Sequence, residues 1–143
     1  MNRPLEVARR RGRELAFRVI FQADVAGVPL REAWTLRCEE ERPGEAPRAL
    51  VDDVIAVLEA RTAEIDGILR ECAEHWTLER LAATDRAVLR AAVGELLARP
   101  KTPARIVLDE AIEIAKRFGA ADSGRFVNGV LDRAAKQLRP QEF

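Results

Sequence analysis

Arginines near the start of the sequence are the residues with the clearest potential for chemistry. Four of them occur within five positions, in the segment Arg9-Arg10-Arg11-Gly12-Arg13. A positive charge at the N-terminal end of a helix opposes the helix dipole at a cost of about 0.3 to 1 kcal/mol, so a cluster there requires a compensating benefit. Guanidinium groups match phosphate oxygens and stack on bases, which predicts binding to a nucleic acid. The alternative is a solvated, charged end of the chain with no ligand.

Glycines in the segment 118–131 form a second unusual pattern. Gly119 follows the end of one helical pattern, where it is expected to cap a helix, and Gly124 and Gly129 lie inside the next pattern. Because glycine inside a helix costs about 1 kcal/mol relative to alanine, the latter two indicate either close packing between helices or close approach of a ligand. The patterns GxxxxGK[ST] and GxGxxG do not occur in the sequence, so a nucleotide phosphate loop is not predicted.

The other chemically active side chains do not form a recognisable catalytic set. His75 is the only histidine, and no serine or cysteine partner for it follows from the sequence. Cys38 and Cys72 lack both a CxxC spacing and a histidine cluster, so we expect neither a zinc site nor a nucleophile. The pairs Asp52-Asp53 and Asp109-Glu110 occupy adjacent helix positions about 100° apart, and such carboxylates do not converge on one reacting atom. The sequence therefore predicts no catalytic residue, no metal and no cofactor, and a protein that is not an enzyme.

Charge is distributed unevenly along the chain, although 24 basic and 24 acidic residues cancel. Residues 1–18 contain six arginines and two glutamates. Residues 19–98 contain nine basic and sixteen acidic residues, and residues 99–143 contain nine basic and six acidic residues. If the two basic ends meet in the fold, they form one positive face.

Length and composition favour a single globular domain over residues 1–143, because the chain is 48% hydrophobic and of a common domain size. Two cysteines are too few for a disulfide scaffold, which favours a reduced, cytoplasmic protein. No apolar run approaches the roughly 20 residues needed to cross a membrane. No signal peptide is expected, because Glu14, Arg18 and Asp24 interrupt the apolar residues after the arginine-rich start.

Helix-forming residues dominate the sequence, and alternating β-branched runs are absent, so the chain is predicted to be all-α. The pattern at 4–26 leaves only a narrow polar stripe, which indicates a central helix wrapped by others. Thr102 is expected to cap the helix that follows it, with Pro103 in the first helical position. About seven helices in one or two small bundles are expected, over residues 4–26, 30–40, 47–74, a short turn at 76–81, 85–98, 103–118 and 122–138.

Three motifs in the same order resemble the NusB family of bacterial transcription antitermination factors. They are the arginine-rich opening Arg9–Ala16, the segment Asp85–Arg90 followed by Glu95-Leu96, and the run Asp109–Gly119 that continues through Asp122-Ser123 into Phe126–Asp132. The resemblance covers nearly the whole chain, and the last motif is the most distinctive. It implies an all-α fold of two small bundles that share the central N-terminal helix.

The resemblance also implies a function in binding rather than in catalysis. Members of the family bind the single-stranded boxA element in the leader of ribosomal RNA transcripts, together with a small-subunit ribosomal protein, NusE. The pair joins the RNA polymerase elongation complex and favours transcription through terminators. Some members form homodimers, and the sequence leaves open whether this chain does.

Site residues follow from the resemblance position by position. Phe21 stands where relatives can have a tyrosine, so a hydrogen bond through that hydroxyl is not expected here. Phe126 suits stacking on an unpaired base, with a half-exposed ring that faces the arginine cluster, and burial in the core is the alternative. Asp85 is implied to face the ribosomal protein, because an acidic surface suits a basic partner. The implied RNA-binding residues are Arg9, Arg10, Arg11, Arg13, Phe21, Asp122 and Phe126, and the implied partner-binding residues are Asp85, Arg86 and Arg90.

Two other functions are compatible with the same sequence. The first is a purely protein-binding helical adaptor, for which the arginine cluster would be dispensable. The second is a stand-alone relative of the RNA-binding domain found in some ribosomal RNA cytosine methyltransferases. A methyltransferase needs a further domain with a glycine-rich cofactor loop, and these 143 residues contain no such loop.

Overall fold

The computed structural model describes residues 3–143, and this part of the chain contains α-helices, two short 3-10 helices and no β-strand. The prediction of an all-α protein is therefore confirmed. The seven α-helices are α1 (Arg3–Ala26), α2 (Leu30–Glu41), α3 (Glu45–Ala60), α4 (Thr62–Cys72), α5 (Ala83–Ala98), α6 (Ala104–Phe118) and α7 (Ser123–Leu138). The two 3-10 helices are η1 (Leu78–Arg80) and η2 (Pro140–Glu142).

The single helix expected over 47–74 is two helices, because the chain turns at Arg61 between α3 and α4. The backbone of Arg61 leaves the helical region, with φ −130° and ψ 31°. The Thr62 hydroxyl donates a hydrogen bond to the Leu58 carbonyl, an alternative to the helical pattern that threonine side chains offer at helix ends. The short turn expected at 76–81 is η1. The expected total of about seven agrees with the seven α-helices, but the prediction counted this turn as one of the seven and treated α3 and α4 as a single helix.

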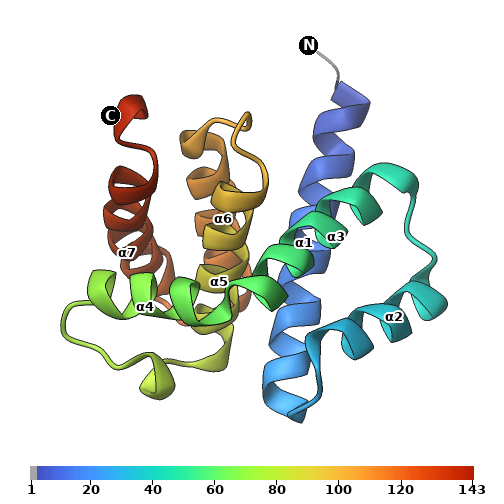
Figure 1. Cartoon of the computed structure of the whole chain (residues 1–143), viewed down its shortest axis with the longest axis horizontal. Helices are drawn as coiled ribbons and strands as arrows, with labels where there is room; N and C mark the ends of the chain where they lie inside the picture. Colours follow the sequence, from blue (N-terminus) through green and yellow to red (C-terminus); the bar gives the residue numbers. More distant parts are fainter. Residues whose placement is uncertain (1–2) are drawn as a thin grey trace.

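Two hydrophobic cores share α1, as the resemblance implied. Leu15, Val19 and Ala23 of α1 pack with α2 and α3 in the smaller core, whereas Phe17 and Ile20 of α1 pack in a larger core with α3 to α7. In Figure 1, α3 crosses over α1, and α2 lies on the side of α1 away from α5, α6 and α7. The most enclosed helix is α5, which contacts α1, α3, α4, α6 and α7. The central position expected for α1 is therefore shared with α5.

Gly12 and Gly119 are required for space rather than for a left-handed backbone. A Cβ atom at Gly12 would lie 2.9 Å from Leu50 Cδ2 and 3.2 Å from the backbone of Pro47, so glycine permits the crossing of α1 and α3. Gly119 is the C-cap of α6 as predicted, and a Cβ atom there would lie 2.5 Å from the Ser123 hydroxyl. The Ser123 hydroxyl in turn accepts a hydrogen bond from the Ala120 amide at 2.9 Å, which fixes the turn into α7.

The two glycines inside α7 differ in their surroundings. A Cβ atom at Gly124 would lie 3.0 Å from the Lys116 side chain, so Gly124 allows close packing of α7 on α6. A Cβ atom at Gly129 would meet only the guanidinium of Arg133, at 3.8 Å and 3.9 Å. Close helix packing, one of the two interpretations of Gly129, is therefore not observed.

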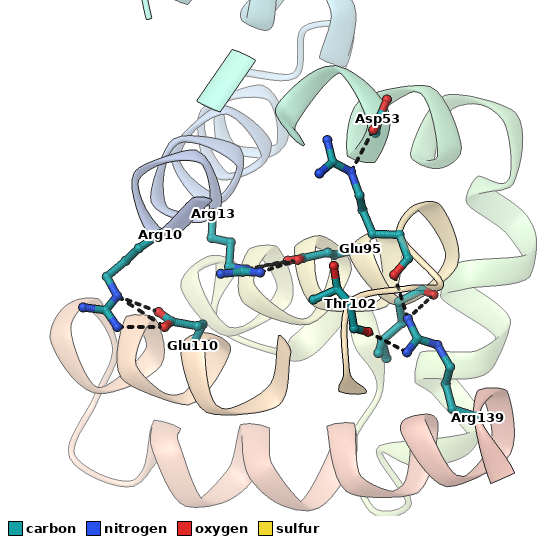
Figure 2. Close-up of polar contacts among 9 residues, drawn as sticks. Arg10, Arg13, Asp53, Glu95, Thr102, Glu110 and Arg139 are labelled. Atoms are coloured by element: carbon teal, nitrogen blue, oxygen red, sulfur yellow. Dashed lines mark hydrogen bonds and ion pairs between the residues drawn. The ribbon is translucent and has the colours of Figure 1, made fainter. Parts of the chain in front are cut away.

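Arg139 joins the ends of α5, α6 and α7, a role that the sequence analysis missed. Its guanidinium donates hydrogen bonds to the carbonyls of Leu96, Arg99 and Thr102, at 2.9, 3.0 and 2.8 Å (Figure 2). The prediction that Thr102 caps α6 is wrong, because its side chain makes no capping hydrogen bond there. The Glu142 carboxylate instead accepts a hydrogen bond of 2.9 Å from the Ala104 amide at the start of α6.

Candidate nucleic-acid interface

The arginine-rich end of α1 lies beside α6. Arg10 pairs with Glu110 at 3.1 Å (Figure 2), and Glu14 pairs with Arg117 at 2.6 Å. Further along, the rings of Phe17 and Phe118 lie 5.2 Å apart. Residue numbers rise together along both helices, so α1 and α6 run in the same direction. We call this line of contacts the α1–α6 seam, formed by Arg10, Glu14 and Phe17 on α1 and Glu110, Arg117 and Phe118 on α6.

Arg9 and Arg11 are the free cations at the start of the seam. Neither forms an ion pair or a side-chain hydrogen bond with any residue in 3–143, and Arg11 is exposed while Arg9 is half-buried. Arg10 is exposed but holds the Glu110 carboxylate, whose hydrogen bond and charge raise the pKa of Arg10. Arg9 and Arg11 thus present two guanidinium groups without a partner in residues 3–143. A phosphate that binds Arg10 would have to replace the Glu110 carboxylate.

Arg13 is separated from the other three arginines. Its side chain is 9% exposed and forms a two-point ion pair with Glu95 of α5, with Nε at 2.9 Å and Nη2 at 2.8 Å (Figure 2). Glu95 is itself only 3% exposed. The guanidinium of Arg13 is therefore occupied inside the protein, and we leave it out of the candidate RNA surface.

An aromatic and cationic cluster follows the arginines along the seam. Phe21 is half-buried, and its ring centroid lies 6.1 Å from that of Phe17. The guanidinium groups of Arg18 and Arg117 lie over the Phe118 ring, at 5.0 Å and 4.9 Å from its centroid. Stacked cations and rings of this kind are suited to contact unpaired bases. Arg18, Arg117 and Phe118 were not among the predicted site residues.

Glu14 holds two of these arginines in place. Burial opposes its ionisation, but hydrogen bonds from Arg117 and Arg18 keep the pKa of Glu14 below its ordinary value. The carboxylate therefore stays charged at neutral pH. It positions both guanidinium groups next to Phe118 by accepting their hydrogen bonds, at 2.6 Å from Arg117 and 3.2 Å from Arg18.

Asp122 is the N-cap residue of α7, and Phe126 lies on the first turn of that helix, beyond the C-terminal end of α6. Asp122 is exposed and makes no capping hydrogen bond through its side chain. Phe126 is half-buried, as expected, but its ring contacts Trp76 rather than the arginine cluster. The two ring centroids lie 5.9 Å apart with an edge-to-face angle of 73°. The ring of Phe126 is therefore partly covered by Trp76, and its role in binding RNA stays a prediction.

The three predicted partner-binding residues have different surroundings. Arg86 donates to the Asp24 carboxylate at 2.8 Å and to the carbonyls of Leu78 and Leu81 at 3.1 and 2.8 Å. Arg90 pairs with Asp66 at 3.0 Å. The guanidinium groups of Arg86 and Arg90 are therefore both used in contacts within the protein. Asp85 is different, because its Oδ1 atom is buried without a hydrogen-bond partner in the described chain.

Other kinds of site find little support within residues 3–143. Burial raises the pKa of both cysteine thiols, Cys38 and Cys72, which keeps them protonated and weakly nucleophilic. This part of the chain contains no group of three or more histidine, cysteine or acidic side chains placed to hold a metal ion. None of its helices is long and apolar enough to cross a membrane.

Comparisons with known proteins agree on one family. The NusB family model matches residues 10–136. The transcription antitermination protein NusB of Koribacter versatilis (strain Ellin345) is 42% identical over 91% of this chain and 90% of its own length. The NusB protein of Sorangium cellulosum (strain So ce56) is also 42% identical, over 92% of this chain and 94% of its own length.

Solved structures show the same arrangement of helices. The structure of T. maritima NusB is 38% identical, covers 94% of each chain and superposes with a TM-score of 0.83. A crystal structure of the antitermination factors NusB and NusE in complex with dsRNA is 24% identical, with a TM-score of 0.82 over 91% of this chain and 97% of that one. At that identity the second structure establishes the fold alone.

Proposed function

The chain belongs to the NusB family, and on this basis we propose that it is a transcription antitermination factor that binds the boxA RNA of ribosomal RNA leader transcripts. In this proposal it acts together with the small-subunit ribosomal protein NusE and joins the RNA polymerase elongation complex. Residues 1–143 serve as a single RNA-binding domain. The place of action is the bacterial cytoplasm, where transcription occurs.

The observation that carries the RNA-binding role is the pair of unpartnered arginines at the start of the α1–α6 seam. Arg9 and Arg11 have no acidic partner in residues 3–143, although the chain as a whole contains as many acidic as basic residues. Phosphates supply the missing negative charge, and their binding releases counterions from the RNA. Beyond Arg10, the seam offers Arg18 and Arg117 over Phe118, where bases stack.

We propose that the protein acts by binding and not by catalysis. In support, burial raises the pKa of its two thiols and keeps them protonated. The arginines of the seam are paired with carboxylates, Arg10 with Glu110 and Arg117 with Glu14. Such pairs suit phosphate recognition, because an arginine can exchange one oxyanion for another without a change in its own charge.

A titration of labelled boxA RNA tests the proposed function directly. Fluorescence anisotropy is measured for boxA RNA and for a scrambled RNA of the same composition, each with and without NusE. We expect tighter binding of boxA than of the scrambled RNA, and a further gain when NusE is present. Equal affinity for both RNAs under both conditions would contradict the proposal. NusE binding without any RNA binding would instead support the helical adaptor.

Asp85 and Arg86 allow the partner-binding role to be separated from folding. Because Asp85 Oδ1 is buried without a hydrogen bond, its removal relieves an unpaired polar atom, and Asp85→Ala is expected not to lower the melting temperature. Asp85→Arg is expected to weaken NusE binding at least tenfold through repulsion of a basic partner. Arg86→Met is the neighbouring control, because it strands two backbone carbonyls and should lower the free energy of unfolding by about 1 to 3 kcal/mol.

Calorimetry for NusE binding and thermal melts for stability give both quantities for each variant. A lower melting temperature for Asp85→Ala with intact NusE binding would assign Asp85 to the start of α5 instead of to the interface.

A further inference from the structure

Trp76 presents a large aromatic surface to solvent between α4 and η1. Its side chain is 59% exposed, although its backbone amide is held by a 2.8 Å hydrogen bond to the Ala73 carbonyl. The indole contacts Phe126 edge-to-face, so the pair forms a two-ring surface and the indole is not fully covered. The chain's other tryptophan, Trp34, is 2% exposed and donates to Asp52. Trp34 is therefore part of the hydrophobic core, whereas Trp76 is not.

The adjoining face of α7 has no side chain at Gly129 and carries the Arg133 guanidinium. Phe126, Gly129 and Arg133 are spaced three and four residues apart and so lie along one face of the helix. The absence of a side chain at Gly129 leaves open space beside Phe126, bounded by the Arg133 guanidinium. Arg133 is oriented by a 2.7 Å hydrogen bond from its Nε to the Cys72 carbonyl, and its two terminal nitrogens form no hydrogen bond within residues 3–143.

These features fit a ligand with a flat ring and a nearby negative charge. We propose that Trp76, Phe126 and Arg133 form a binding place for one unpaired nucleotide of the RNA, with the base against the indole and a phosphate on the Arg133 terminal nitrogens. The inference rests on the proposed RNA-binding function. It adds a second contact region to the α1–α6 seam.

The polar surroundings of the indole favour a nucleotide over an apolar protein surface. Glu74, His75 and Thr77, which flank Trp76 in sequence, are all exposed, and so is Arg125 on α7. The centres of protein–protein interfaces are depleted in charged residues, whereas bases stack on aromatic rings within charged surroundings. Glu74 is the one opposing charge at Arg133, with its carboxylate 3.9 Å from Nε.

The test replaces the indole and the guanidinium separately and measures boxA RNA binding by anisotropy in the presence of NusE. Trp76→Leu keeps an apolar side chain but removes the ring, and it is expected to weaken RNA binding about 5- to 150-fold without changing the dependence on salt. Arg133→Gln is expected to weaken binding and to reduce the slope of log affinity against log salt by about 0.7. Arg61→Gln, at the junction of α3 and α4, removes the same charge and should leave both quantities unchanged.

Each outcome bears on the proposal. RNA-dependent quenching of tryptophan fluorescence that is lost in Trp76→Leu would support stacking on the indole, because Trp34 is buried. Unchanged RNA affinity of Trp76→Leu, with tight binding by the parent protein, would overturn the nucleotide site and leave the proposed function intact. Weaker NusE binding with unchanged RNA binding would also overturn it, in favour of a protein contact. Failure of the parent protein to bind boxA RNA would remove the proposed function and this inference with it.

Discussion

Arg13→Met is expected to lower the free energy of unfolding by about 3 to 5 kcal/mol while the folded protein keeps its affinity for RNA. The reason is the position of Glu95, which is 3% exposed and accepts hydrogen bonds from both Nε and Nη2 of Arg13. Without Arg13, a carboxylate would be left buried and unpaired. The expected loss is one of stability alone, because the Arg13 guanidinium is buried against Glu95 and is not part of the proposed RNA surface.

A double-mutant cycle separates this pair from its surroundings. Urea denaturation gives the free energy of unfolding of Arg13→Met, of Glu95→Leu and of the double variant. The double variant should recover most of the lost stability, since a buried ion pair can often be replaced by apolar residues of similar volume. A single variant as stable as the parent would contradict this account, and so would a loss of RNA affinity in fully folded Arg13→Met.

The sequence already contained a signal that distinguishes Arg13 from its neighbours. Ala16, Phe17 and Ile20 follow Arg13 at helical spacings of three, four and seven, and all three are buried. Arg13 thus continues the apolar stripe of α1, and Glu95 likewise lies within the apolar pattern of α5. Spacing along each helix can therefore predict that both charges are buried. That they meet each other, 82 positions apart, depends on how α1 crosses α5.

Helices and their ends were largely predictable, because they depend on local spacing and on glycine and proline. The roles of Arg86 and Arg139 were not. Each donates to backbone carbonyls near the end of another element, η1 for Arg86 and α5 for Arg139. Helix ends leave carbonyls without partners, but which long side chain reaches them is decided by tertiary packing. For the same reason the sequence could not place Phe126 against Trp76.

The arginines at the start of α1 should show the converse behaviour to Arg13, with a large loss of RNA affinity and no loss of stability. Replacing Arg9, Arg10 and Arg11 by alanine removes three proposed phosphate contacts, which should flatten the slope of log affinity against log salt by about 2. The same relation corresponds to a loss of a few hundredfold in affinity at about 50 mM salt. Stability should be unchanged or slightly higher, because these cations oppose the dipole of α1 and the exposed Arg10–Glu110 pair contributes little.

A matched control decides whether position or net charge is responsible. Arg31, Arg61 and Arg70 are exposed on α2, at the α3–α4 junction and on α4, and each pairs with a nearby glutamate. Replacing these three by glutamine removes the same total charge from a different part of the molecule. RNA titrations from low to high salt should then give the parent slope for the control and a flatter one for the α1 variant. If both variants flattened the slope equally, RNA would be responding to the charge of the whole protein, and the start of the α1–α6 seam would lose its assignment as the phosphate-binding surface.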